Sequence, residues 1–287
     1  MLLDDPALDQ RSPGQEFARV HSQLGPATCV TLRASITTRF PLFEHRPRLT
    51  VRDLMKVAVV GGDRVTYARE LAADGGERPI SAAANAPEAA FRCAAEEARV
   101  STIAARAPVP PELLGDPAAL AALVDYRLLV RLCTAENDFL LHGACPGTDG
   151  QVIGLLDTPG LRRQDALGSA PETILAAASR CERFGGSADG IVMNPADWWP
   201  LVGAPGFLAA LDQAGVRINR TRLVPPGLAV VGDFQAGATV LDRQLATIRL
   251  EEADGATHLV GEIQEGLAVH LPGHFVVTSL PRGAGSQ

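Results

Sequence analysis

Apolar residues recur every three or four positions over residues 116–142, which is the period of a helix with one buried face. The residues on this face are Leu120, Val124, Leu128, Leu132, Ala135 and Phe139. Asp116 is suited to cap the helix, Pro117 fits its first turn, and Gly143 is a favourable stop. About 26 residues at about 1.5 Å each predict a spine helix roughly 39 Å long.

Two shorter helices are predicted on either side of this spine. One covers residues 14–24, and the other covers residues 171–184 with Ser169 as its cap. The apolar edge of the first helix is formed by Phe17, Val20 and Leu24. Residues 27–50 contain prolines and show no helical period, which predicts an extended arm.

Residues 51–110 show a different pattern, in which strand-like outer pieces flank a small, polar and turn-rich middle. This pattern predicts a long two-stranded ribbon. Such a ribbon is only marginally stable by itself and has no buried face unless another molecule supplies one. The segment therefore indicates a protein that assembles with partners.

The C-terminal half has a mixed pattern. Residues 191–194 (IVMN) are typical of a short buried strand, and Pro195 begins a short helix that runs through Trp198 and Trp199. After residue 227 the chain consists of apolar, β-rich segments. We therefore expect an α+β fold.

The composition is that of a globular protein, with 287 residues, 46% of them hydrophobic and 21% charged. The net charge of −7 makes the chain a poor candidate for binding a phosphate backbone, so no specific nucleic acid is expected as a partner. Lys56 is the only lysine, which leaves almost no amine for covalent chemistry.

The cysteines and the N-terminal residues indicate the cellular compartment of the protein. Five cysteines are scattered without a Cys-x-x-Cys pair, so neither a zinc site nor a disulfide framework is predicted. The N-terminal residues lack the positive charge and the apolar core of a signal peptide, and no apolar run reaches about 18 residues. We expect a cytoplasmic protein with reduced thiols and no membrane partner.

One short motif raises the possibility of a nucleotide hydrolase. Residues 155–160 (LLDTPG) end an apolar run with Asp-x-x-Gly, as in a GTPase strand. That chemistry also needs a phosphate-binding loop, and no glycine-rich loop precedes Lys56. We interpret the motif as a strand followed by a Pro-Gly turn. An α/β enzyme that uses the region of Asp157 or His142 is an alternative.

The histidines do not form a catalytic or metal-binding set. His142 is expected to interact with the terminal carbonyls of the spine helix. His270 and His274 flank a Pro-Gly turn, but no carboxylate or cysteine completes a ligand set. No catalytic residue, metal or cofactor is predicted, and the protein is expected not to be an enzyme.

Two other groups of side chains have structural interpretations. Asp125, Glu136 and Asp138 are expected on a solvated or inter-subunit face of the spine helix. Trp198 and Trp199 are expected to pack in the core rather than to stack on a ligand.

A set of short motifs follows the same order as the predicted elements. Before the spine helix they are LTVRDL (49–54), VTYARE (65–70), NAPEA (85–89), VSTIA (100–104) and LLGD (113–116). After it they are LHG to GLL (141–156), IVMNPADW (191–198), VGDF (231–234) and LDR (241–243). Each motif alone is modest, but their order and spacing together are specific.

These motifs resemble those of the Hong Kong 97-like fold, which tailed-phage major capsid proteins share with encapsulins, the shell proteins of bacterial nanocompartments. The resemblance covers roughly residues 27–280, although Asn85 and Ala89 depart from the family pattern. By this resemblance LLDTPG belongs to a turn that follows the spine helix.

The resemblance implies an α+β chain with the following divisions: an N-terminal helix and arm (1–50), an E-loop region (51–110), a P-domain spine helix (111–149), an A-domain (150–240), and P-domain C-terminal strands with a tail (241–287). It implies self-assembly into an icosahedral shell of about 60 copies or more. Assembly contacts of the E-loop are expected from Tyr67, Arg69, Glu70, Pro79, Pro87 and Glu88.

Two departures favour encapsulins over phage capsids. The E-loop tip has no lysine, so covalent crosslinking is not expected. Few residues precede the arm, and they include one short helix, as in encapsulins, whose N-terminal helix faces the lumen and helps to dock cargo. Phe17, Val20 and Leu24 would form this docking face. The preferred function is a non-enzymatic shell around an unidentified cargo enzyme, and the alternative is a phage or prophage capsid protein that packages DNA.

Overall fold

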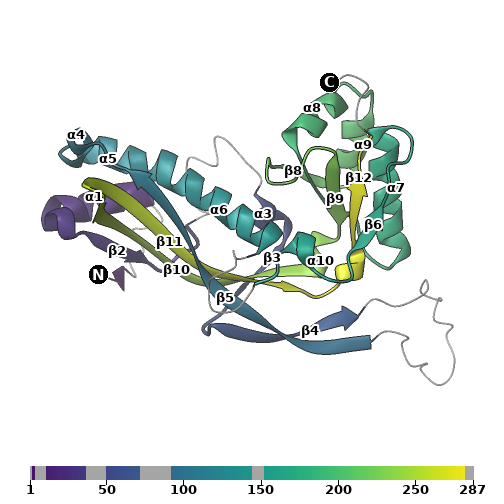
Figure 1. Ribbon diagram of the computed structural model, residues 1–287, viewed down its shortest axis with the longest axis horizontal. Helices are drawn as coiled ribbons and strands as arrows, with labels where there is room; N and C mark the ends of the chain where they lie inside the picture. Colours follow the sequence, from purple (N-terminus) through teal and green to yellow (C-terminus); the bar gives the residue numbers. More distant parts are fainter. Residues whose placement is uncertain (1, 4–10, 37–49, 72–91, 144–151, 282–287) are drawn as a thin grey trace.

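The chain is organised around two β-sheets and one long helix (Figure 1). The computed structural model describes residues 2–3, 11–36, 50–71, 92–143 and 152–281. The long helix lies along one face of the larger sheet, and the smaller sheet with its helices stands at one end of the molecule (Figure 1). Helices and strands are both abundant, so the expected α+β class is confirmed.

The larger sheet has seven strands in the order β1-β2-β10-β11-β5-β4, with β3 paired to β10. Their bounds are β1 (Leu2–Leu3), β2 (Cys29–Leu32), β3 (Lys56–Val59), β4 (Arg64–Leu71), β5 (Arg92–Pro108), β10 (Ala238–Ala253) and β11 (Ala256–Val269). The hairpin of β10 and β11 turns at Asp254 and Gly255, both with positive φ, as a tight hairpin turn requires.

The spine helix forms where its apolar period predicts it. It consists of α5 (Pro117–Leu123), a π-helical segment (Val124–Leu128) and α6 (Leu129–His142). Asp116 caps its start by accepting from the Ala118 and Ala119 N–H groups at 2.9 and 3.1 Å, and Gly143 ends it with a φ of 81°. Both predicted caps are confirmed. The π-helical segment was not predicted, because one wide turn barely disturbs a three-to-four spacing.

The smaller sheet has the order β6-β12-β9-β7-β8 and is flanked by helices. Its elements are β6 (Arg162–Gln164), α7 (Ala170–Arg183), β7 (Gly190–Met193), α8 (Pro195–Val202), α9 (Phe207–Gln213), β8 (Arg217–Arg220), β9 (Leu228–Gly232), α10 (Phe234–Gly237) and β12 (Phe275–Ser279). Ser169 caps α7 as predicted, in a reciprocal capping box with Glu172. α9 and β8 were missed, because they are too short to show a period.

Strand β12 (Phe275–Ser279) brings a C-terminal segment into the smaller sheet. It falls within residues 241–287, which were assigned to the P-domain strands, but it pairs with β6 and β9 of the smaller sheet. A boundary near residue 240 therefore does not separate the two sheets.

The segment that enters the ribbon begins with a helix rather than a strand. α3 (Val51–Leu54) is held by a capping box, in which Thr50 Oγ1 accepts from the Asp53 N–H group at 3.4 Å and Asp53 Oδ2 accepts from the Thr50 N–H group at 2.6 Å. The strand-like interpretation of these residues was wrong, because this local box outweighs their β-propensity. Two other short helices are α1 (Pro13–Leu24), which confirms the predicted N-terminal helix, and α4 (Pro111–Leu114).

Candidate assembly site

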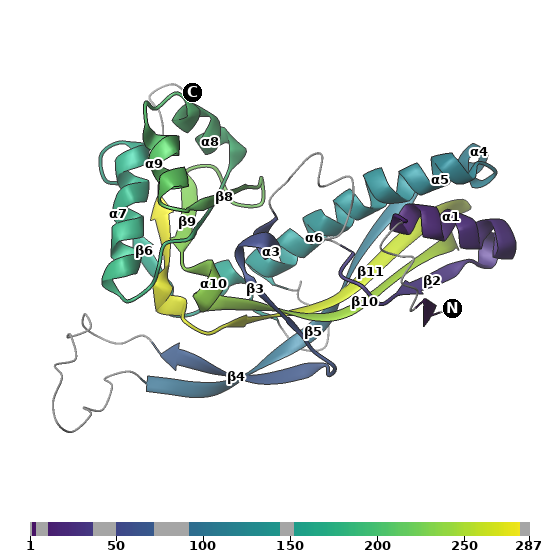
Figure 2. The same ribbon diagram turned by 180° about the vertical axis from the view of Figure 1, so that it is seen from behind.

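The hairpin of β4 and β5 projects from the body of the molecule in both views (Figures 1 and 2). Its strands pair in register from Arg64 opposite Arg99 to Leu71 opposite Arg92. In β4, which the structure describes throughout, every side chain is exposed or half-buried. The small cluster of buried apolar residues that the hairpin shares with β10 and β11 is Ala98, Leu241 and Ala268. The hairpin therefore gains little burial from its own chain.

Polar contacts of the half of β4 nearest the tip hold the hairpin against the body of the subunit. Arg69 Nη1 donates to Glu96 Oε1 at 2.9 Å, and Arg69 also donates to the backbone carbonyl of Pro159. The Tyr67 hydroxyl donates to Glu96 Oε2 at 3.4 Å, and its ring packs edge-on against His270 at 5.2 Å. Burial, followed by the charge of Glu96, raises the pKa of Tyr67. The expected residues Tyr67, Arg69 and Glu70 therefore lie in the half of β4 nearest the tip, where they contact the body of the subunit at His270 and Pro159.

The remaining expected E-loop residues are Pro79, Pro87 and Glu88, and they lie outside the described residues. Their contribution to assembly stays a prediction. Glu70 contributes through its backbone, since its N–H group donates to the His270 carbonyl at 2.8 Å.

The LLDTPG motif forms a support for this hairpin. Leu155–Asp157 is a 3-10 turn rather than the expected strand, and Thr158 Oγ1 donates to the Gly154 carbonyl at 2.8 Å. A Cβ at Gly154 would lie 2.4 Å from the His142 backbone, so glycine is required for this close approach. The turn presents the Pro159 carbonyl to Arg69.

The four-residue helix α3 links several elements through its backbone. At its start, the Val51 N–H group donates to Asn137 Oδ1 of the spine helix at 2.9 Å. At its end, the Leu54 carbonyl accepts from Arg217 Nη2 at 3.0 Å and from Gln235 Nε2 at 2.7 Å, both beside the smaller sheet. α3 therefore ties the segment that leads into β3 to the spine helix and to the smaller sheet.

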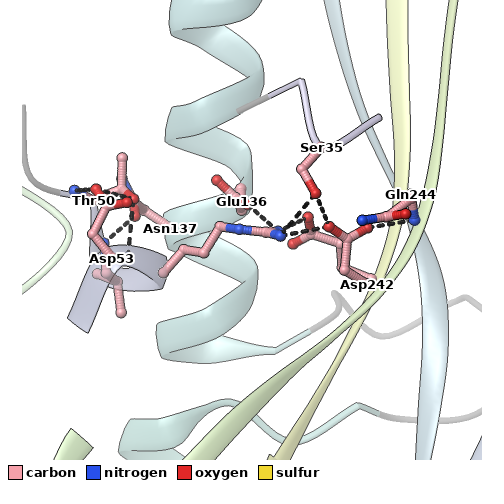
Figure 3. A network of polar contacts seen from close by, with 10 residues as sticks. Ser35, Thr50, Asp53, Glu136, Asn137, Asp242 and Gln244 are labelled. Atoms are coloured by element: carbon pink, nitrogen blue, oxygen red, sulfur yellow. Dashed lines mark hydrogen bonds and ion pairs between the residues drawn. The ribbon is translucent and has the colours of Figure 1, made fainter. Parts of the chain in front are cut away.

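The side chain of Arg52 is buried, 1% exposed, and it contacts several polar side chains. It forms ion pairs with Glu136 of the spine helix at 3.2 Å, with Asp242 of β10 at 2.5 Å, and with Glu265 of β11. Ser35 of the arm also accepts from Arg52 at 3.3 Å and donates to Asp242. Glu136 and Asp242 approach the network from opposite sides (Figure 3). We call Arg52, Glu136, Asp242 and Glu265 the arginine joint.

The N-terminal helix α1 docks on the spine helix (Figure 2). Asp125 Oδ1 accepts from the Gly14 N–H group at 2.8 Å, and Asp125 Oδ2 accepts from Ser12 Oγ at 2.5 Å. Phe17 and Val20 are 0% and 1% exposed, because the apolar face of α1 packs on the chain's own core. These two side chains cannot serve as an exposed cargo-docking face in this conformation.

The docking of α1 leaves one of the expected cargo-facing residues accessible. Leu24, at the end of the helix, is 55% exposed. Cargo docking by the N-terminal helix stays a prediction, and Leu24 is the member of the expected face that can contact another molecule.

No protein-family model matches the chain. A curated relative is the major capsid protein of Enterobacteria phage HK97, which is 26% identical over 219 residues. The match covers 72% of this chain, and the chain spans 57% of the length of that relative.

Solved structures of a virus-like particle, a capsid and a phage are similar over most of the chain. A virus-like particle from Pyrococcus furiosus matches with a TM-score of 0.60 at 13% identity, covering 83% of this chain and 95% of that one. The capsid of a native GTA particle matches with a TM-score of 0.56 at 14% identity, covering 81% and 90%. Mycobacterium phage Adephagia matches with a TM-score of 0.58 at 12% identity, covering 82% and 91%.

The chain has the Hong Kong 97-like capsid fold. The spine helix of this chain carries two buried carboxylates, which were expected at a solvated or inter-subunit face. Asp125 and Glu136 are 8% and 0% exposed, whereas Asp138 is exposed. The expectation was wrong for the first two, because their partners come from distant parts of the chain. Burial raises the pKa of Asp125 despite its hydrogen bonds to Ser12 and Gly14.

The histidines of this Hong Kong 97-like chain connect separate segments. His142 Nε2 lies 3.0 Å from the Leu223 carbonyl, rather than at the terminal carbonyls of its own helix. His270 Nε2 lies 3.0 Å from Thr239 Oγ1, and His274 Nδ1 lies 3.7 Å from Asp233 Oδ2. Within the described ranges, no three His, Cys, Asp or Glu side chains converge as a metal site.

The two tryptophans differ in their environment. Trp198 is half-buried against the core of the smaller sheet, but Trp199 is 63% exposed, so the expectation of core packing was wrong for Trp199. Arg220 lies over both rings, at 5.6 and 5.8 Å from their centroids. No helix in the described part of the chain is long and apolar enough to cross a bilayer.

Proposed function

We propose that this chain is the structural subunit of a closed icosahedral shell built from copies of itself. The β4–β5 hairpin is the observation that carries the proposal. It extends from the body with no fully buried side chain in β4, so it needs a neighbouring subunit to bury a face. Contacts that pass from one subunit to the next close into rings, and rings close into a shell. The similarity to capsid and virus-like particle structures supports the same function.

In this proposal the β4–β5 hairpin acts as the E-loop. Tyr67, Arg69 and Glu70 set its direction, and Pro79, Pro87 and Glu88 contact the neighbouring subunit. Deletion of residues 72–88 should then block closure of the shell without unfolding the subunit, since the anchoring contacts lie outside the deleted residues. Folded subunits that form no particles are the expected result. Intact shells from the deletion variant would contradict the proposal.

The proposed contents of the shell are a cargo protein, and the subunit itself is not an enzyme. Leu24 at the end of α1 is the exposed position proposed to contact cargo. A second candidate is a phage or prophage capsid that packages DNA, and it is favoured by the phage origin of the curated relative. Native particles treated with nuclease and protease decide between the two. Protected protein of a second kind favours the first candidate, and protected DNA favours the second.

A further inference from the structure

The arginine joint contains three carboxyl groups and one guanidinium, and all four side chains are buried. Its four side chains are between 0% and 3% exposed. One guanidinium faces three carboxyl groups, each of which is ion-paired to it. Two uncompensated negative charges would be very unfavourable at such burial. The charge of the joint therefore depends on whether its acids hold protons.

The neighbours of the three acids differ. Asp242 accepts from Arg52, from Ser35 and from the Gln244 N–H group at 2.6 Å, so its ionised form has three donors. Glu136 and Glu265 lie next to each other, because Oε1 of each accepts from the same nitrogen, Arg52 Nη1. Two carboxyl groups can hydrogen-bond to each other only when one of them carries a proton.

We propose that Glu136 and Glu265 share one proton in the folded subunit, and that loss of this proton at alkaline pH opens the joint between α3, the spine helix and the β10–β11 hairpin. The Val60 N–H group, in the turn that enters β4, donates to the Asp242 carbonyl at 2.9 Å. Opening would therefore free the start of the β4–β5 hairpin and loosen the shell, a consequence that rests on the proposed function. The arginine joint is then a proton-dependent lock between the assembly hairpin and the body of the subunit.

The other groups around the joint agree with this assignment. The titratable and charged groups that face it are Arg52 and Asp53 from α3, Cys133 and Glu136 from α6, Asp242 from β10, and Glu265 from β11. Burial raises the pKa of Cys133, which keeps it a neutral thiol. Arg52 is the cation among these groups, so the second glutamate gains no compensating charge when it ionises.

The sign of the pH effect follows from the direction of the shift. Burial, and then the charge of Glu136, raise the pKa of Glu265 well above its ordinary value. The stabilisation by this proton is therefore complete below the ordinary pKa of glutamic acid, and it is lost as the pH rises through the raised pKa. The stability of the joint should fall on the alkaline side.

The shared proton can be detected in the subunit alone, without assembly of a shell. Infrared difference spectra of the wild-type protein and Glu265→Gln at neutral pH should show one protonated carboxylic acid that the variant lacks. The glutamine amide can still donate to Glu136, and its carbonyl can accept from Arg52. Glu262→Gln is the matched control, since Glu262 lies on the same strand in a half-exposed pair with Arg249. If Glu265→Gln does not fold, Glu136→Gln removes the same proton from the other side.

The consequence for assembly is tested by light scattering of particles during an alkaline titration. Wild-type and Glu262→Gln particles should dissociate at the same pH, and Glu265→Gln particles should stay closed to a pH at least one unit higher. Absence of the infrared band in the wild type overturns the shared proton. If the wild type shows the band but the Glu265→Gln particles dissociate at the same pH as the wild type, the shared proton does not control the joint. If the chain forms no particles at all, only the proposed function fails, because the infrared band still decides the proton.

Discussion

The hydroxyl of Ser12 lies 2.5 Å from Oδ2 of Asp125, across 113 residues of sequence. This contact attaches the N-terminal helix to the π-helical segment of the spine helix, where Asp125 is buried. The same carboxylate also accepts from the Gly14 N–H group. One acid of the spine helix thus satisfies two donors at the start of α1.

Asp125→Ala should destabilise the subunit, because it leaves the Ser12 hydroxyl and the Gly14 N–H group buried without this acceptor. We expect the free energy of unfolding to fall by about 1–3 kcal/mol. Urea denaturation measures it. Asp138→Ala is the control on the exposed side of the same helix, and it should change the stability by less than about 0.5 kcal/mol. Equal stability of the two variants would show that the Asp125 contacts are dispensable.

Gly14→Ala should separate α1 from the spine helix. A Cβ at Gly14 would lie 2.2 Å from the Ala121 carbonyl oxygen and 2.7 Å from Asp125 Cγ, and the first of these is backbone that cannot move aside easily. We expect a loss of about 1–3 kcal/mol, as for other overpacked sites. Hydrogen exchange should increase in residues 13–24.

The control for this substitution is Gly115→Ala, since a Cβ there would meet nothing within 4 Å and the residue has ordinary helical φ and ψ. It should leave exchange in α1 unchanged. Unchanged exchange in Gly14→Ala would mean that α1 does not pack as closely as described.

Arg52→Met should be among the most damaging single substitutions in the chain. It removes the cation from three buried carboxyl groups, and breaking such a buried network costs about 3–5 kcal/mol. Arg64→Met is the matched control, because Arg64 forms an exposed ion pair with Glu97 that is worth about 0–1 kcal/mol. Thermal and urea unfolding of both variants give the comparison. A small effect at Arg52 would argue against the joint as a structural centre.

Arg69→Ala should weaken assembly more than it weakens the subunit. Arg69 pairs with Glu96 across the hairpin and donates to the Pro159 carbonyl of the body, so its loss removes a contact that orients the hairpin and leaves the core intact. We expect shells to form only at a subunit concentration at least about tenfold higher, which corresponds to about 1.4 kcal/mol. Sedimentation of particles over a concentration series measures this threshold, with Arg64→Ala on the same strand as the control. Equal thresholds for the two variants would contradict the role of Arg69.

Regular elements with local signals were predictable from the sequence. The spine helix combines an apolar period with Asp116 and Gly143 at its ends, and Ser169 with Glu172 marks the start of α7. The two-stranded ribbon was also predictable, because the small and polar residues between its strands cannot form a buried face. The resemblance to capsid proteins added the order in which these elements combine.

The arginine joint could not be predicted, because its members are separated by up to 213 residues and come from one helix turn, the spine helix and two strands. Charged residues on an apparently amphipathic helix suggest a solvated face, and only the fold shows that Glu136 faces inward. The Thr50 and Asp53 capping box was a local signal for α3 that could have been used. The burial of Phe17 and Val20 depends on where α1 docks, which no local pattern encodes.

Electron microscopy of the chain expressed alone tests the central claim most directly. The account predicts uniform closed particles of one diameter, since the hairpin and the body of each subunit supply complementary surfaces for the next. A folded monomer that stays monomeric at high concentration, with the hairpin intact, would contradict it.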